Sequence, residues 1–520
     1  MVFDTIMANL IQRIIKLEKY SKYGLIAIVL YSVIVFVLTS FYRVSGDGCW
    51  HIPVGKFIAS NFKLPLFEPL GRDEPFWSPP LYHLIVAFVY YLFSRFSNEA
   101  ANFAVKFISP IFGVLSLVAS FIVIKKLKNT KIAFYSIIFL ASIPIFIDYG
   151  VLSYVESTLL FFILMSIYFA INEKVILSAV FAGLSILVKY NGVLILPVLV
   201  FILYSKFSKQ TNKRERLANR KIYYRNLLIV VVVPLLIALP WLLRNWVFLG
   251  NPVWPFLNFI FHGYQLKSYT GVDLSILASP KLFVSTYLGI FGVPDGNYAA
   301  LSFFKLNYFW FLFAVWVAGT LIFVTPLIIG MFNLQKIGNP SNYNKIILVW
   351  IFSYLILFVL YAVNVGPFVS RMLLPAFPAI SILWATGLER LLFNKKLKSF
   401  LIILIITVIF GMVLSESFKF SLSSKAWGFY GRDFKWVKLN TNNNAIFIAN
   451  GQCIPYNIER TSLYATNETI KQADLIWVNQ KFTLDKKSIL DDQTLKLIES
   501  QNYSIAYYNN KTGTRIYRIK

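Results

Sequence analysis

The chain has few cysteines, few histidines and few charged residues. Its 520 residues include 2 Cys and 3 His, and 14% are charged, against about a quarter in ordinary soluble domains. Two cysteines cannot build a disulfide scaffold or a cysteine-rich metal site. We expect Cys49 and Cys453 to be independent thiols, although both fall on the same predicted side of a membrane and a pairing stays open. The low charge, together with 58% hydrophobic residues, excludes an ordinary soluble globule and indicates a polytopic membrane protein.

Acidic residues are also scarce: 23 Asp and Glu stand against 50 Lys and Arg, which gives a net charge of +27. A basic excess can serve nucleic-acid binding. However, basic residues collect in the cytoplasmic loops of membrane proteins during insertion, and this explains the excess with no nucleic-acid partner. No cleavable signal peptide is evident, because the first apolar run begins near Tyr23 and is long enough to remain as a span.

Eleven apolar segments can be threaded through a bilayer with nearly every Lys/Arg cluster on one side. This threading places the N-terminus in the cytoplasm and the C-terminus outside. Residues 1–416 are therefore predicted to form a mainly α-helical transmembrane bundle. The predicted spans are 24–42, 103–124, 132–147, 157–171, two short crossings within 175–204, 227–247, 308–330, 346–363, 372–388 and 399–415.

Two large external loops and a soluble domain are predicted on the outer side. The first loop, 43–102, contains the apolar run 82–93, which we interpret as an interfacial or re-entrant helix because a crossing there would put the next lysine cluster outside. The second loop, 248–305, carries aromatic residues that favour an interfacial belt, with a cover over a lipid tail or a sugar as the alternative. Residues 417–520 read as a small extracytoplasmic α/β domain, with buried strands at 445–449 and 475–478 and a hairpin of 504–508 with 516–519.

Two acids are predicted at the outer ends of spans. Asp47 lies between two glycines directly after the first span, and Glu156 begins the fourth. Ionisable residues at this depth tend to be functional when they face a cavity. For Glu156 the alternative is an acid favoured by the helix macrodipole. Residues 148–150 are assigned to a connecting loop.

His51 and His83 both lie in the first external loop, so two acids and two histidines could hold a divalent metal ion. Their spacing matches no metal motif, and hydrogen-bonding histidines are therefore the favoured interpretation.

Three cations are predicted on the same face: Lys189, Arg244 and Arg371. Such side chains bind phosphate, Arg through a bidentate fork and Lys as a point charge. The alternative is extension to lipid headgroups, which we favour for Lys189 and not for Arg371.

These residues stand in motifs that resemble the GT-C superfamily of membrane glycosyltransferases, within the branch of protein O-mannosyltransferases and lipid A aminoarabinose or galacturonic acid transferases. The likeness covers most of the first 400 residues. Besides the two acids, the matching elements are Pro79–Tyr82, Val188–Gly192, Pro240–Asn245, Gly250–Pro252 and Arg371–Pro378. Gly48 stands where the mannosyltransferases carry Glu, and no Trp-Trp-Asp-Tyr-Gly sequence occurs, which disfavours protein O-mannosylation and oligosaccharyl transfer respectively.

The resemblance implies a GT-C-type fold and transfer of a sugar from a polyprenyl-phosphate-linked donor to a glycolipid or protein acceptor, on the extracytoplasmic face. The residue usage, rich in Lys, Asn, Ile and Phe, fits an AT-rich prokaryotic genome, and we expect the protein in a prokaryotic plasma membrane. Our hypothesis is an inverting reaction with Asp47 as general base and Glu156 assisting. The expected substrate-binding residues are Tyr82, Arg244, Asn245 and Arg371, with Lys189, His51 and His83.

Two other classes remain open: a transporter or flippase for a lipid-linked sugar, and a non-catalytic assembly subunit of the same fold. Transporters often have internal repeats and midplane polar residues. The sequence shows no repeat, and its ionisable residues are predicted at the outer surface, so a transferase is favoured.

Overall fold

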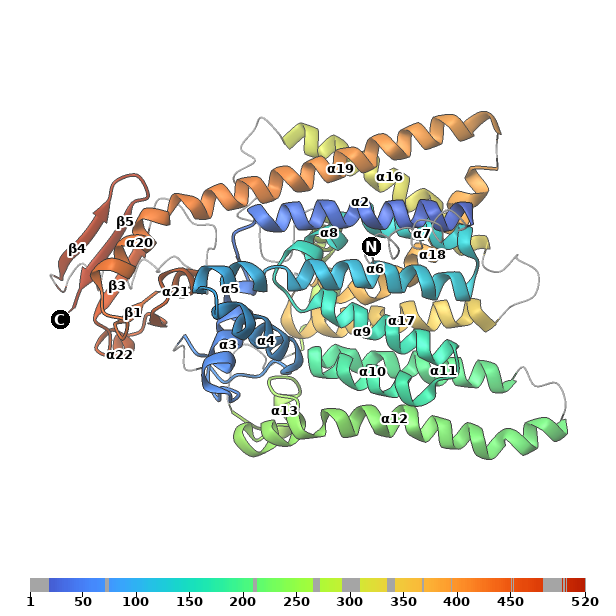
Figure 1. The fold of residues 1–520 in the computed structure, drawn as a ribbon, viewed down its shortest axis with the longest axis horizontal. Coiled ribbons are helices and arrows are strands. Elements are labelled where there is room, and N and C mark those ends of the chain that lie inside the picture. Colours follow the sequence, from blue (N-terminus) through green and yellow to red (C-terminus); the bar gives the residue numbers. More distant parts are fainter. Residues whose placement is uncertain are drawn as a thin grey trace, which may run out of the picture.

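The structure is a computed structural model that describes residues 18–70, 74–208, 213–264, 272–291, 309–333, 342–366, 369–393, 395–449, 451, 453–479, 498, 501 and 503–519. Helices make up most of it, and a small sheet lies at one end (Figure 1). The helices of the bundle are α2 (Lys19–Phe41), α5 (Asn98–Val105), α6 (Ile108–Leu127), α7 (Thr130–Ser142), α8 (Pro144–Val151), α9 (Glu156–Ile171), α10 (Val175–Val188), η1 (Tyr190–Leu194), α11 (Ile195–Ser208), α12 (Lys213–Leu249), α16 (Phe309–Asn333), α17 (Asn342–Val365), η4 (Ser370–Ala376), α18 (Phe377–Leu391) and α19 (Lys395–Phe429).

Each of the eleven predicted spans coincides with helix, but the helices differ in length. Among the described residues, seven helical stretches are long and apolar enough to cross a membrane, and the bent pair α7–α8 raises the number to eight. Shorter apolar helices account for the spans expected at 157–171 and 175–188 and for part of 308–330. A helix satisfies its backbone hydrogen bonds internally, which is what a lipid environment requires.

Helices α16 and α18 approach each other closely. A Cβ added to Gly387 would lie 1.8 Å from the carbonyl oxygen of Pro326, and one added to Gly330 would lie 1.9 Å from that of Leu383. Glycines therefore allow backbone-to-backbone packing here, as is usual between membrane helices.

The segment expected to span at 132–147 is broken. α7 and α8 meet at an angle of 66°, because Pro144 opens α8 and has no N–H to continue the preceding helix. The prediction of a loop at 148–150 is wrong: these residues lie inside α8, where Asp148 is fully buried.

The first external loop forms two packed helices, α3 (Gly48–Asn61) and α4 (Leu81–Ser94). A Cβ added to Gly55 would lie 2.3 Å from a methyl group of Val86, so the two helices touch through this glycine. Both lie at the end of the bundle that carries the C-terminal domain (Figure 1). The 14 residues of α4 match the predicted apolar helix at 82–93. Its placement at the membrane interface stays a prediction.

The second loop contains α13 (Asn258–Phe261), η3 (Leu274–Ala278) and α14 (Pro280–Phe291), and its residues 265–271 and 292–305 lie outside the described ranges. Its aromatic residues do not act as one belt. Trp254 is fully buried and its Nε1 donates to the carbonyl of Tyr264 at 2.7 Å, whereas Phe259 is 56% exposed. The belt expectation is therefore wrong for Trp254.

The C-terminal domain is built on a five-stranded sheet. The order is β2-β1-β3-β5-β4, with β1 parallel to both β2 and β3 and the remaining pairs antiparallel. The predicted strands and the hairpin are confirmed, and α19 continues through the predicted boundary at 416/417 to Phe429. The elements are α20 (Gly431–Asn440), β1 (Ile446–Ile448), α21 (Cys453–Ile458), β2 (Thr461–Leu463), α22 (Asn467–Ile470), β3 (Leu475–Asn479), β4 (Ser504–Asn509) and β5 (Thr514–Arg518).

A disulfide joins this domain to the first external loop. Cys49 of α3 is bonded to Cys453 of α21, across 404 residues of sequence. Nearby, the backbone N–H of Ser462 donates to the carbonyl of Leu70 at 2.8 Å. The expectation of two independent thiols is wrong, because docking of the domain brings together two segments whose proximity no local pattern reveals.

Candidate active site

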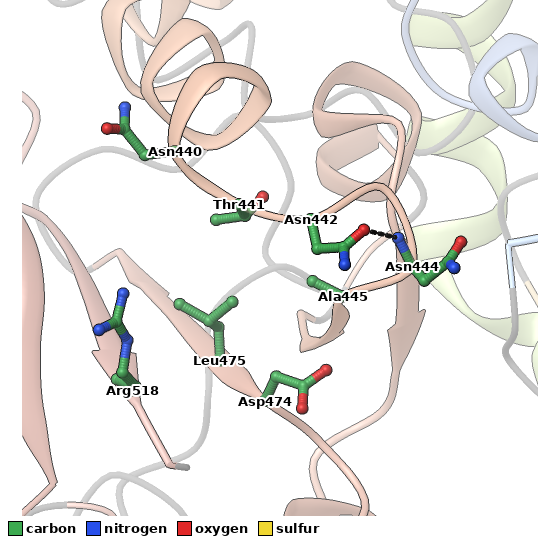
Figure 2. A pocket seen from close by; sticks show the side chains of 8 residues that line it. All are labelled: Asn440, Thr441, Asn442, Asn444, Ala445, Asp474, Leu475 and Arg518. Atoms are coloured by element: carbon green, nitrogen blue, oxygen red, sulfur yellow. Dashed lines mark hydrogen bonds between the residues drawn. The ribbon is translucent and has the colours of Figure 1, made fainter.

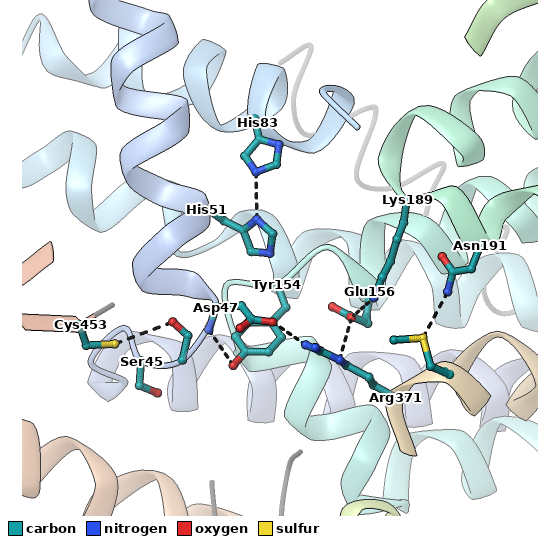
Figure 3. A network of polar contacts seen from close by, with 12 residues as sticks. Ser45, Asp47, His51, His83, Tyr154, Glu156, Lys189, Asn191, Arg371 and Cys453 are labelled. Atoms are coloured by element: carbon teal, nitrogen blue, oxygen red, sulfur yellow. Dashed lines mark hydrogen bonds and ion pairs between the residues drawn. The ribbon is translucent and has the colours of Figure 1, made fainter. Parts of the chain in front are cut away.

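Asp47 and Arg371 form an ion pair at the end of the bundle where α3 begins. Arg371 Nη1 donates to Asp47 Oδ2 at 2.5 Å (Figure 3). Asp47 precedes α3, and Arg371 comes from η4, 324 residues later. The Asp47 side chain is 38% exposed and that of Arg371 is 23% exposed, so both groups are paired yet reachable.

Glu156 lies beside this pair but is buried. Its side chain is 4% exposed, and its Oε1 receives Lys189 Nζ at 2.8 Å and lies 3.9 Å from Arg371 Nε. Its Oε2 has no hydrogen-bond partner among the described residues. The expectation that Lys189 extends to lipid headgroups is wrong, because its ammonium neutralises this carboxylate. The two predicted acids are thus brought into one cluster with two of the three predicted cations.

A glycine and a tyrosine hold Asp47 in place. Gly46 adopts φ +56°, and a Cβ there would lie 2.0 Å from the hydroxyl of Tyr154. That hydroxyl accepts the Asp47 backbone N–H at 2.9 Å, and the Arg371 guanidinium lies over the Tyr154 ring, 6.0 Å from its centre. Tyr154 belongs to the segment that precedes Glu156, but no sequence signal distinguished it from the other aromatic residues.

The charges around Asp47 set its protonation. Burial raises the pKa of Asp47, but Arg371, His51 and Lys189 together outweigh burial and hold the pKa below its ordinary value. The carboxylate is therefore ionised at neutral pH.

The two histidines pair with each other. His51 Nδ1 and His83 Nε2 are 2.9 Å apart, both rings are buried, and the ring of fully buried Tyr82 lies 5.4 Å from that of His51. Burial lowers the pKa of His51 to about 4, so the ring is neutral at pH 7. This agrees with the favoured interpretation of hydrogen-bonding histidines.

The described residues contain no cluster of three or more His, Cys, Asp or Glu side chains arranged to hold a metal ion. Asp47 and Glu156 are each engaged by a cation, and the two imidazoles are engaged by each other. This donor set does not fit the divalent ion that the sequence left possible, and no step is derived through one.

Arg244 and Asn245 lie in a separate network. Arg244 donates to the carbonyls of Phe76 and Pro65 at 2.6 and 2.8 Å, and Asn245 donates to the hydroxyl of Tyr190 at 2.7 Å. Both side chains thereby fasten α12 to the first external loop and to η1. Among the described contacts, neither reaches Asp47 or Glu156.

A further ionic cluster was missed by the sequence analysis. Lys419 of α19 forms ion pairs with Asp148 and with Glu416, and both carboxylates are buried. It joins α19 to α8. Asp148, an acid within an otherwise apolar stretch, was the available signal, since such residues pair when buried.

Comparison with known proteins agrees with this architecture. Residues 77–242 match the family model described as dolichyl-phosphate-mannose-protein mannosyltransferase. No curated protein matches the chain in sequence. The fold is similar to that of ArnT from Cupriavidus metallidurans in the apo state (TM-score 0.62, 13% identity, 96% of this chain and 98% of that chain covered) and bound to undecaprenyl phosphate (0.60, 11%, 95% and 97%). It is also similar to the Archaeoglobus fulgidus oligosaccharyltransferase in the apo form (0.59, 13%, 89% and 70%).

These findings confirm the predicted resemblance to the GT-C superfamily of membrane glycosyltransferases. At such low identity, the structural likeness speaks for the fold alone. The family model spans Glu156 and Lys189 but neither Asp47 nor Arg371. The chain is thus an integral membrane protein of GT-C fold, and the chemistry of its site must be argued from the residues themselves.

Proposed function

We propose that this protein transfers a sugar from a polyprenyl-phosphate-linked donor to an acceptor hydroxyl, with inversion at the anomeric carbon and Asp47 as the general base. The observation that carries the proposal is the contact between a reachable carboxylate and a reachable guanidinium, Asp47 and Arg371. The carboxylate can accept a proton, and the guanidinium can bind a phosphate. Both lie at the end of the bundle that the topology prediction places outside the cytoplasm.

The proposed step needs a base on one side of the reacting carbon and positive charge on the other. The acceptor oxygen attacks the anomeric carbon and its proton passes to the Asp47 carboxylate. The bond from that carbon to the phosphate oxygen breaks, and its electrons leave with the lipid phosphate. Arg371 would bind that phosphate through its fork, and fixed positive charge at a developing anion lowers the barrier.

The ion pair suggests an order of events. While Arg371 holds Asp47, the pKa of the carboxylate stays low and the group is a weak base. A donor phosphate that takes over the guanidinium removes this stabilisation, so the pKa of Asp47 rises and the carboxylate becomes a better proton acceptor. Base strength would thus depend on the bound donor. Glu156, held by Lys189, would keep Arg371 oriented and offer its unpartnered oxygen to the acceptor.

The names of the fold relatives support the donor class. One ArnT structure contains undecaprenyl phosphate, and an Archaeoglobus fulgidus oligosaccharyltransferase structure contains dolichol-phosphate together with an inhibitory peptide. Both are phosphates of long isoprenoid lipids. A glycolipid and a protein are both compatible with the acceptor side of this proposal, and membrane lipids surround the bundle.

The test is an activity assay with Asp47→Asn. Purified protein in lipid is given labelled polyprenyl-phosphate sugars, and release of lipid phosphate is measured. We expect the variant to lose at least about 10²-fold in rate, in the range typical of base catalysis. Asp273→Asn is the matched control, because Asp273 is an exposed N-cap where Asn serves equally.

Full activity of folded Asp47→Asn would remove the base assignment. Movement of the intact lipid-linked sugar across the bilayer without bond cleavage by the wild-type protein would point to a flippase instead. If the wild-type protein neither cleaves nor transports the lipid-linked sugar, the alternative of a non-catalytic assembly subunit remains.

A further inference from the structure

A cavity with a mixed polar and apolar lining lies where the C-terminal domain meets the first external loop. Its volume is about 370 Å³, within the range of about 300–1,000 Å³ typical of small-molecule sites. Helices α3, α4 and α5 form one side of it and the α21 region forms the other. The lining residues that matter here are Lys56, Tyr90, Asn98, Asn102, Tyr456 and Glu459.

The cavity is separate from the Asp47 cluster. Lys56 follows Asp47 by nine residues along α3, which corresponds to about 13 Å of helix and a net half turn. The two residues therefore face opposite sides of α3. Cys49 lies on the same side as Lys56, and its disulfide to Cys453 holds the α21 wall in place.

Aromatic rings flank Lys56, the one cation among the described residues that line the cavity. Lys56 Nζ lies 5.5 Å from the ring centre of Tyr90 and 5.7 Å from that of Tyr456, and 3.9 Å from the Glu459 carboxylate. Burial lowers the pKa of Lys56. Lys438 also reaches Glu459, at 3.3 Å, from outside the lining. An entering anion would meet the Glu459 carboxylate and an entering cation would meet Lys56, so the lining suits a neutral ligand.

The hydrogen-bonding groups of the cavity are incompletely used. The Oδ1 atom of Asn102 is buried with no hydrogen-bond partner among the described residues, and a buried acceptor of this kind is costly unless something donates to it. Asn98 accepts from the Tyr90 hydroxyl at a long 3.3 Å. Amides, a carboxylate and an ammonium beside two tyrosine rings can bind many hydroxyl groups and also contact the C–H face of a sugar ring.

We propose that this cavity is a second binding site, which takes neutral sugar residues of a glycan. The part of that glycan bound here would be remote from the hydroxyl that reacts at Asp47. On the proposed transferase function, the natural source is the acceptor, and the C-terminal domain would then help to select acceptors that carry such residues.

A second cavity provides a control. It has a volume of about 310 Å³ and lies in the C-terminal domain, where its lining includes Asn442, Asn444, Asp474 and Arg518 (Figure 2). None of the described residues that line it carries an aromatic ring. Without a ring, it lacks the feature that would seat the apolar face of a sugar.

The binding experiment uses the full-length protein in detergent. Saturation-transfer NMR and calorimetry are run with neutral di- to tetrasaccharides of glucose, mannose, galactose and N-acetylglucosamine, and with a hexose phosphate. We expect at least one neutral saccharide to bind, and Asn102→Ala and Tyr456→Ala each to weaken it about tenfold. Asn444→Ala, at the control cavity, and Asp47→Asn should bind as wild type does.

The proposal is overturned if no neutral saccharide binds, if only the hexose phosphate binds, or if Asn102→Ala and Tyr456→Ala bind as the wild type does. Thermal melting of each variant identifies misfolding, and Asn102→Ala alone suffices if Tyr456→Ala does not fold. Saccharide binding without any transferase activity would refute the proposed function and support this site. Transferase activity without saccharide binding would support the proposed function and refute this site.

A kinetic measurement identifies the source of the glycan. The saccharide that binds best is added to the transfer assay. If the site reads the acceptor, the saccharide raises the acceptor KM and leaves kcat unchanged. If both constants stay unchanged while binding is saturated, the glycan comes from a molecule other than the acceptor.

Discussion

Replacement of Arg371 is the most informative perturbation of the site. Arg371→Gln removes the guanidinium that contacts Asp47 at 2.5 Å and lies 3.9 Å from Glu156. If Arg371 binds the leaving phosphate, its loss should lower kcat by about 10²–10³-fold, the usual cost of deleting one donor to a developing anion. The kcat of Arg371→Lys should lie between those of the wild type and Arg371→Gln, because an ammonium keeps the positive charge but cannot form the bidentate contact of a guanidinium.

The contact with Asp47 adds a second, independent readout. Arg371 holds the pKa of Asp47 below its ordinary value. The base works deprotonated, so activity falls as pH drops through this pKa. Removing Arg371 raises the pKa, and the acid limb of the pH–rate profile should therefore move to higher pH in Arg371→Gln.

A double-mutant cycle completes the test. Residues in direct contact typically show coupling energies of about 0.5–3 kcal/mol, so the losses in Asp47→Asn and Arg371→Gln should not add. The assay is release of labelled lipid phosphate, with circular dichroism as the folding control. Strictly additive losses together with an unmoved acid limb would refute the view that the two residues act as one unit.

Three further predictions concern stability. Reduction of the Cys49–Cys453 disulfide, or Cys453→Ser, should cost about 2–5 kcal/mol; equal melting temperatures with and without reductant would contradict this. The pKa of His51 is about 4 in the folded protein and near 6.5 in the unfolded chain, so the unfolded chain binds more protons between these pH values. The free energy of unfolding should therefore fall by about 3 kcal/mol as the pH drops from 6.5 to 4. His51→Gln should reduce this pH dependence in thermal melts. Lys419→Met leaves Asp148 and Glu416 buried without their cation and should lower the free energy of unfolding by about 3–5 kcal/mol. Lys511→Met, at an exposed position, should change the melting temperature little. Equal melting temperatures for the two variants would argue against the buried pairing.

The sequence anticipated those parts of the site that lie at the ends of apolar segments. Asp47, Glu156, Lys189 and Arg371 were all named as candidates because a charge beside a membrane span stands out against an apolar background, although Lys189 was expected to extend to lipid headgroups. Their pairing was not predictable, since Asp47 and Arg371 are 324 residues apart. Arg244 was assigned with them because it shares the predicted face, yet its guanidinium binds backbone carbonyls of the first external loop. Position along a membrane normal can be inferred from hydropathy, but position within the membrane plane depends on which helices pack together.

Buried ionic contacts were the least predictable feature. Asp148 was assigned to a loop, although it lies in α8 opposite Lys419 of α19. Its side chain is polar, and local patterns place polar residues in loops. Only a partner from a distant helix makes its burial favourable.

What the sequence alone determined is the class of protein, the helical segments, the strands of the C-terminal sheet and the residues worth testing, because periodicity, hydropathy and charge are local properties of the chain. The tertiary structure decided which acid meets which cation, that the two cysteines join, and that a cavity opens between α3 and the C-terminal domain. Those outcomes depend on contacts between segments hundreds of residues apart, and their free energy exists only once the helices have packed.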